Sequence, residues 1–130
     1  MVGIVIVSHS QKVAEGIRDM ALQMSNPQQR IVAAGGTDNG KIGTDVMKIS
    51  EAIVAANAGD GVVVMVDLGS AVMSTDTALE FLDEKTRDQV KIADAPILEG
   101  AISATVEASL GSSLATVLAT AEGARNLRKC

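Results

Sequence analysis

The only histidine of the chain, His9, and an aspartate, Asp67, each stand just beyond an apolar run that is typical of a buried strand. If the two strands are neighbours in a parallel sheet, their backbones leave its edge roughly 5 Å apart. A carboxylate bound to one imidazole nitrogen fixes the tautomer and leaves the other nitrogen free as a nucleophile. The pair therefore favours phosphoryl transfer through histidine, which needs little beyond positioning and donors for the phosphoryl oxygens. A lone histidine can also be a surface or capping residue, and the residues alone leave that alternative open.

Two glycine-containing segments could supply the hydrogen-bond donors for the phosphoryl oxygens. Residues 68–71 place backbone N–H groups at the expected start of a helix, which is a ready anion site. Gly35, Gly36 and Thr37 could form a second wall, because their small side chains permit close approach. Either segment could also be an ordinary turn, and only their convergence on His9 makes them specific.

Two other phosphate-related sites fit the same residues less well. Residues 35–41 match G-x-x-x-x-G-K, but Ile42 stands where a P-loop needs Ser or Thr to hold Mg²⁺. A receiver domain phosphorylated on Asp67 would need acidic residues after the first strand to bind Mg²⁺, and Ser8, His9 and Ser10 stand there instead. We therefore expect no metal site and no cofactor.

The composition excludes several classes of protein. The net charge is −5, and the chain has no Trp, no Tyr and one Phe, which argues against a nucleic-acid-binding surface. A single Cys and a single His leave no disulfide framework and no thiolate or histidine metal cluster. No apolar run approaches the length of a membrane helix, and the first apolar segment lacks the features of a signal peptide. We expect a cytoplasmic protein that does not insert into membranes.

Strand and helix patterns alternate along the whole chain. Apolar, β-branched runs predict strands at 2–7, 31–34, 62–66 and 90–93. Helical patterns follow them, with Ser10 and Thr44 as expected caps of the first two, and later helices at about 71–84, 97–109 and 112–127. We predict one α/β domain over residues 1–130, with a mainly parallel sheet of about four strands in the order 2-1-3-4. Helices cover both faces, and the chain ends in a helical pair.

One helix carries a face of small residues. Ala101, Ala104 and Ala108 repeat at helical spacing in the expected helix 97–109. Such a face can pack against the sheet of its own chain, or it can form a dimer interface, and both alternatives stay open.

Five blocks of residues resemble the phosphotransfer subunits of phosphoenolpyruvate-dependent dihydroxyacetone kinases, which have the mannose-type enzyme IIA fold of the bacterial phosphotransferase system. The resemblance runs from residue 2 to about residue 111 with the blocks in the family's order, and its most discriminating parts are Ser-His-Ser and Asp-Leu-Gly-Ser-Ala. The blocks are Val5–Ser10, Ala33–Gly35, Ile42–Asp45, Val66–Ala71 and Ala95–Ala101.

The resemblance implies a phosphoryl relay. The phosphocarrier protein HPr would phosphorylate His9, which would pass the group to ADP on the nucleotide-binding subunit of the kinase. Dihydroxyacetone on a third subunit would then be phosphorylated at the expense of phosphoenolpyruvate, which places the chain in glycerol metabolism. Asp67 matches the carboxylate that orients the histidine ring in the family. The residues that surround the phosphate in the family are matched by Gly36, Thr37, Gly69 and Ser70. A homodimer is also expected.

Two alternatives remain beside this relay. The chain could be the enzyme IIA component of a mannose-class sugar transporter and pass the phosphoryl group to a transporter component. Those subunits carry a tryptophan in the loop after the third strand, and this chain has none. It could also be a regulatory module whose phosphohistidine signals and discharges very slowly to any acceptor.

Overall fold

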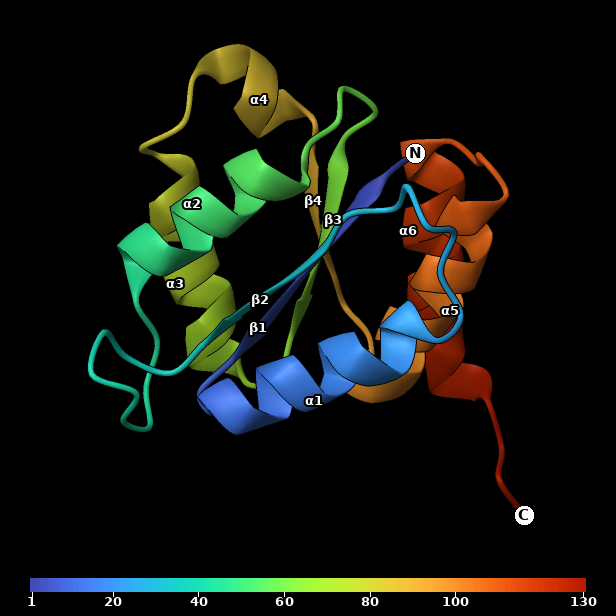
Figure 1. Ribbon diagram of the computed structural model, residues 1–130, viewed down its shortest axis with the longest axis horizontal. Coiled ribbons are helices and arrows are strands. Elements are labelled where there is room, and N and C mark those ends of the chain that lie inside the picture. Colours follow the sequence, from blue (N-terminus) through green and yellow to red (C-terminus); the bar gives the residue numbers. More distant parts are fainter.

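The computed structural model describes residues 1–130 and contains one sheet of four parallel strands (Figure 1). Their spatial order is β2-β1-β3-β4, as predicted, with β4 at an edge. The bounds of the strands are β1 Gly3–Ser8, β2 Ile31–Gly35, β3 Val62–Val66 and β4 Val90–Ala93. β1 and β3 are central and consist mainly of β-branched residues, which suit a strand that is covered on both faces.

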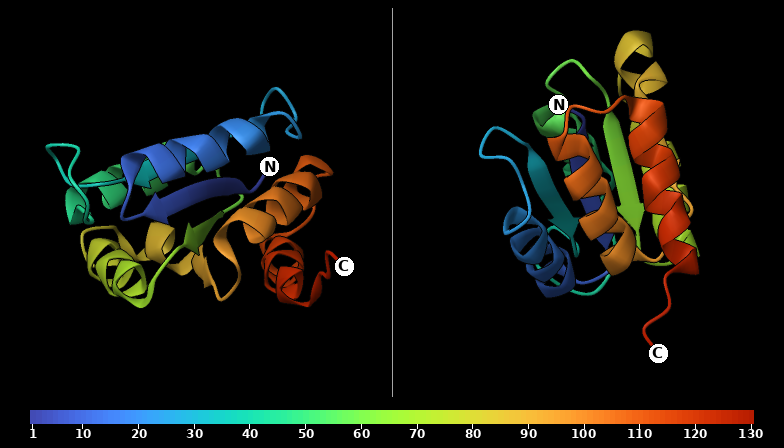
Figure 2. Two further views of the ribbon diagram at one scale, coloured as in Figure 1. Left: turned by 90° about the horizontal axis from the view of Figure 1, so that it is seen from below. Right: turned by 90° about the vertical axis from the view of Figure 1, so that its right-hand side faces the viewer.

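Helices cover both faces of this sheet. Figure 1 shows α2 and α3 on one side of the sheet and α1, α5 and α6 on the other, and Figure 2 shows α5 and α6 side by side. The bounds are α1 Gln11–Leu22, α2 Val46–Ala56, α3 Gly69–Leu79, α4 Glu84–Asp88, α5 Ile97–Ser109 and α6 Leu114–Gly123, followed by the 3₁₀ turn η1 Ala124–Asn126. The closing helical pair is therefore confirmed. No helix is both long enough and apolar enough to cross a membrane.

The alternation of side chains along β1 divides the core into two halves. Ile4 and Ile6 point into the half formed with α1, α5 and α6, and Val5 and Val7 point into the half formed with α2 and α3. All four side chains are completely buried. Because both faces of β1 are packed, the end of this strand is a rigid support for the residues that follow it.

Three local predictions need correction or completion. The N-cap of α2 is Asp45 and not Thr44, because the Asp45 carboxylate accepts the N–H groups of Met47 and Lys48. The helix expected at 71–84 begins at Gly69 and ends at Leu79, and the short α4 begins a new helix. Asp83 marks the new start, because its carboxylate accepts the N–H of Thr86 and so caps α4.

The small-residue face of α5 belongs to the core of the chain. Ala101, Ala104 and Ala108 are completely buried in the half of the core that α5 and α6 share with the sheet. Of the two alternatives for this face, packing within the chain is therefore the one observed.

Candidate functional site

His9 and Asp67 leave the carboxyl ends of adjacent strands, as the sequence predicted. Val7 of β1 is paired with Val66 of β3, so that His9 and Asp67 follow at the same edge of the sheet. His9 Nδ1 lies 2.9 Å from Asp67 Oδ1, and the two side chains are 21% and 19% exposed. The pair is therefore shielded from most of the solvent while one part of the imidazole ring stays accessible.

The Asp67 carboxylate has four neighbouring hydrogen-bonding groups, two at each oxygen. Oδ2 accepts the backbone N–H of His9 and the hydroxyl of Ser8, both at 2.9 Å. Oδ1 accepts the N–H of Leu68 at 2.7 Å and lies 2.9 Å from His9 Nδ1. An ionised carboxylate accepts about four hydrogen bonds and donates none. Since the ionised Asp67 carboxylate has no proton to donate, His9 Nδ1 is the donor in this contact.

This assignment of the proton determines the chemistry of the other ring nitrogen. With the proton on Nδ1, the neutral imidazole carries its lone pair on Nε2. The hydroxyl of Ser70 lies 2.6 Å from Nε2 and, facing a lone pair, must be the donor. The chain Asp67–His9–Ser70 is thus ordered from the carboxylate to the hydroxyl, with Nε2 as the nucleophile.

The environment of Asp67 lowers its pKa below the ordinary value. Partial burial is the largest single influence and would raise the pKa. It is outweighed by the hydrogen bonds from the His9 backbone and ring, the Ser8 hydroxyl and the Leu68 N–H, all of which favour the charged form. Asp67 is therefore ionised at neutral pH, as its role as an acceptor requires.

Ser8 is a site residue that the sequence reasoning missed. Its side chain is 1% exposed, and its hydroxyl donates to Asp67 Oδ2 while accepting the N–H of Ser10 at 3.1 Å. The hydroxyl thereby ties the carboxylate to the start of α1. A polar residue directly after five buried apolar positions was a signal that could have pointed to it.

The amino terminus of α3 is left open next to His9. The N-cap residue is Leu68, whose side chain cannot cap the helix, and the N–H groups of Gly69 and Ser70 bind no acceptor of the chain. By contrast, Ser10 and Asp45 cap α1 and α2, which begin at the same edge of the sheet, whereas α5, which follows Pro96 there, has no side-chain cap either. Free N–H groups and the helix dipole make this end of α3 suitable for an anion.

In the loop between β2 and α2, several backbone N–H groups are bound within the chain. Gly36 N–H binds the carbonyl of Ser8 at 3.1 Å, and Thr37 N–H binds the carbonyl of Lys41 at 2.8 Å. Gly43 N–H binds the carbonyl of His9 at 2.8 Å, which ties the far end of the loop to the nucleophile's own backbone. This loop therefore frames the site, and its amides at Gly36 and Thr37 are engaged within the chain.

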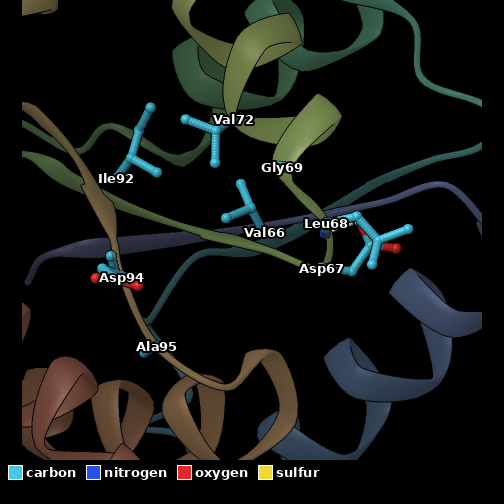
Figure 3. Close-up of a pocket in the computed structure, with 9 residues that line it drawn as sticks. Val66, Asp67, Leu68, Gly69, Val72, Ile92, Asp94 and Ala95 are labelled. Atoms are coloured by element: carbon cyan, nitrogen blue, oxygen red, sulfur yellow. Dashed lines mark hydrogen bonds between the residues drawn. The ribbon is translucent and has the colours of Figure 1, made fainter.

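A pocket lies beside Asp67 and the start of α3, between the carboxyl ends of β3 and β4 (Figure 3). Its volume is about 430 Å³, and its lining is mainly apolar, with Val66, Val72 and Ile92 among the contributors. The only charged side chains in it are the carboxylates of Asp67 and Asp94. The pocket has no cationic side chain that could hold a phosphate group, and Gly69 at the start of α3 also lines it.

The structure brings four of the predicted site residues together, namely His9, Asp67, Gly69 and Ser70. Gly36 and Thr37 belong to the framing loop instead. Nowhere do three His, Cys, Asp or Glu side chains gather in a way that could hold a metal ion. The arrangement contains a positioned imidazole nucleophile and an adjacent open helix terminus, which together are suited to accepting and releasing a phosphoryl group.

Comparison with known proteins identifies the family of the chain. The family described as "PTS system fructose IIA component" matches residues 3–118. The chain is 37% identical over 118 residues to the phosphoryl donor subunit DhaM of PEP-dependent dihydroxyacetone kinase 2 from Listeria innocua, covering 91% of this chain and 94% of that one. It is 41% identical over 121 residues to the phosphoryl donor subunit DhaM from Escherichia coli K12, covering 91% of this chain but only 26% of the longer relative. The crystal structure of EF1359, a protein of unknown function, superposes with a TM-score of 0.80 at 36% identity over 92% of both chains.

Proposed function

The chain belongs to the phosphotransferase-system family described as the fructose IIA component, and from this premise we propose that it is the phosphoryl donor subunit of a phosphoenolpyruvate-dependent dihydroxyacetone kinase. It is a phosphotransferase subunit that carries the phosphoryl group on His9. The names of its relatives support the kinase, since both relatives described above are donor subunits of that enzyme.

The observation that carries the proposal is the order of hydrogen bonds from Asp67 through His9 to Ser70. It leaves the Nε2 lone pair directed toward the open amino terminus of α3. An orienting carboxylate at one end and anion-binding donors at the other are what a phosphohistidine carrier needs.

The transfer step requires no proton to leave the ring. The bond from Nε2 to phosphorus forms while the bond from phosphorus to the donor's histidine breaks. The proton on Nδ1 stays between His9 and Asp67, so the phosphorylated ring carries a positive charge that the carboxylate compensates. The reverse order of events passes the group to the acceptor.

The phosphoryl oxygens would be bound mainly at the start of α3. The free N–H groups of Gly69 and Ser70 and the Ser70 hydroxyl are the available donors. Gly36 and Thr37, which the family resemblance adds to the residues around the phosphate, would contribute through the close approach that their small side chains permit, because their amides are already bound.

The partners follow from the same proposal. The phosphocarrier protein HPr phosphorylates His9, and the acceptor is ADP on the nucleotide-binding subunit, which serves a third subunit that binds dihydroxyacetone. The chain acts in the cytoplasm, in glycerol metabolism, as a homodimer, and residues 1–130 form one mannose-type enzyme IIA-like domain.

A phosphorylation assay with labelled phosphoenolpyruvate, enzyme I and HPr tests the relay. We expect acid-labile, alkali-stable label on the wild-type chain and none on His9→Ala, with circular dichroism as the control for folding. Absence of label on the wild-type chain would refute the carrier function. Addition of the ADP-loaded nucleotide subunit should then discharge the label into ATP.

A second acceptor is suggested by the family description itself, which names a sugar-transport component. In that case the labelled chain would discharge to a transporter component and not to ADP on a kinase subunit. Offering both acceptors to the same labelled protein separates the two functions. Failure of the label to discharge to either acceptor would favour a regulatory module.

A further inference from the structure

We propose that the Ser70 hydroxyl caps the nucleophilic nitrogen of unphosphorylated His9, and that this hydroxyl must leave Nε2 before a phosphoryl group can enter. The statement that the hydroxyl must leave before phosphoryl transfer rests on the proposed function. The cap itself is a property of the resting protein, and it can be measured without any phosphoryl donor.

The first argument concerns space. Ser70 Oγ lies 2.6 Å from Nε2, within hydrogen-bond distance of the nitrogen that has to bond to phosphorus. A covalent bond from nitrogen to phosphorus is shorter than a hydrogen bond and extends in the same direction. The phosphorus atom therefore needs the space in which the hydroxyl now lies, and both groups cannot be there together.

The second argument concerns the direction of the hydrogen bond. The ionised Asp67 carboxylate cannot donate, so Nδ1 holds a proton, and in the neutral ring Nε2 can then only accept. The Ser70 hydroxyl is then the donor, and it engages the very electron pair that attacks phosphorus. A lone pair that is held in a short hydrogen bond is less available as a nucleophile.

The third argument concerns the ease of release. Ser70 is exposed in the first turn of α3, and the space around the preceding Gly69 is open. Rotation about the Cα–Cβ bond of Ser70 breaks only the hydrogen bond to Nε2 and leaves the helix unchanged. The hydroxyl can then donate to a phosphoryl oxygen, so one group would serve the resting and the phosphorylated state in turn.

Acylation of the imidazole by diethyl pyrocarbonate tests the cap on the intact chain. His9 is the only histidine, so the absorbance of the carbethoxyimidazole product reports on this residue alone. We expect Ser70→Ala to react about threefold to tenfold faster than the wild-type chain, the change that corresponds to loss of one hydrogen bond. Thr77→Ala is the matched control, because its hydroxyl lies on the same helix but binds the carbonyl of Met73.

A second pair of variants separates the hydrogen bond from simple shielding. Ser70→Thr and Ser70→Val have nearly the same shape and differ in the hydroxyl. We expect the Thr variant to react like the wild-type chain and the Val variant to react like Ser70→Ala. Equal rates for the Thr and Val variants would overturn the proposal, since they would show that only bulk matters.

The ¹⁵N resonance of Nε2 is an independent readout. We expect it to move toward the position of a free imine-type nitrogen in Ser70→Ala and Ser70→Val, and to stay in place in Ser70→Thr. An unmoved resonance in all variants would show that Nε2 carries no cap. If the cap is found and HPr does not phosphorylate the chain, the proposed function fails while this inference stands.

Discussion

The loop from β3 to α3 and the loop from β2 to α2 both reach His9, but they use their backbone donors differently. In the first loop, the N–H groups of Gly69 and Ser70 bind nothing in the chain. In the second, those of Gly36 and Thr37 are bound to carbonyls of Ser8 and Lys41. The two loops look alike in composition, since each combines glycine with a small hydroxyl residue.

The difference separates a binding role from a supporting role. An unbound donor at a helix terminus costs little where water reaches it, and it gains when an anion arrives. A bound donor holds its loop in one shape and has nothing left to offer to a ligand. Lys48 strengthens the supporting role, because its ammonium donates to the carbonyls of Gly35 and Thr37 at 3.1 and 3.4 Å.

The largest effect on phosphoryl transfer is expected from removal of the Asp67 carboxylate, which connects the loop from β3 to α3 with His9. Asp67→Ala removes the acceptor that orients the ring and compensates the charge of phosphohistidine. We expect the rate of phosphorylation by HPr to fall on the order of 10³- to 10⁴-fold while some transfer remains. Quench-flow measurement of labelled His9 gives the rate, and full activity would remove Asp67 from the mechanism.

A smaller effect on the transfer rate is expected when one free amide at the start of α3 is deleted. Gly69→Pro removes the N–H at the first position of α3, where proline is well tolerated. Leu68 already has the extended backbone that a following proline requires, with φ −128° and ψ 165°. We expect the transfer rate to fall by about a hundredfold with little change in the free energy of unfolding.

Gly69→Ala is the matched control for this deletion. It keeps the N–H, and an added Cβ meets no atom within 4 Å. Its transfer rate should equal that of the wild-type chain. If the Pro and Ala variants transfer phosphate equally fast, the amide of Gly69 does not bind the phosphoryl group.

In the supporting loop, Thr37→Val should disturb stability more than transfer. The hydroxyl oxygen of Thr37 accepts the N–H of Lys41 at 3.2 Å, so its loss should reduce the free energy of unfolding by about 1 kcal/mol. We expect the transfer rate to change by less than about threefold, which corresponds to less than the net free energy of one hydrogen bond. A tenfold or larger loss with unchanged stability would place the Thr37 hydroxyl on the phosphoryl group and erase the contrast between the loops.

The smallest effect is expected in the acid dependence of stability. The pKa of Asp67 is lowered in the folded chain, so the ionised group stabilises the fold above the unfolded value of about 4, and this contribution is lost as the pH falls below it. The difference in urea midpoint between the wild-type chain and Asp67→Asn should therefore narrow in acid. A constant difference from about pH 7 down to about pH 3 would contradict the lowered pKa.

Much of the fold was predictable because its signals are local. The β-branched runs of β1 and β3 predicted the central strands, and the rule that ligands bind beyond the carboxyl ends of parallel strands selected His9 and Asp67. The separation of α4 from α3 was missed. It depends on whether the Asp83 carboxylate turns back to cap the next helix, which helical periodicity does not report.

The sequence by itself determined which groups could do chemistry here: a single histidine, an aspartate after the third strand, and two glycine-containing loops. Only the tertiary structure decided how they are used. The ionised Asp67 carboxylate accepts hydrogen bonds from Ser8 and His9, 59 and 58 positions away, and this sets the tautomer of the ring. The amide of Gly36 is likewise bound because β1 brings the carbonyl of Ser8 alongside it. Hydrogen bonds between segments distant in the chain leave no periodic pattern in the sequence, so the difference between the two loops exists only in the folded molecule.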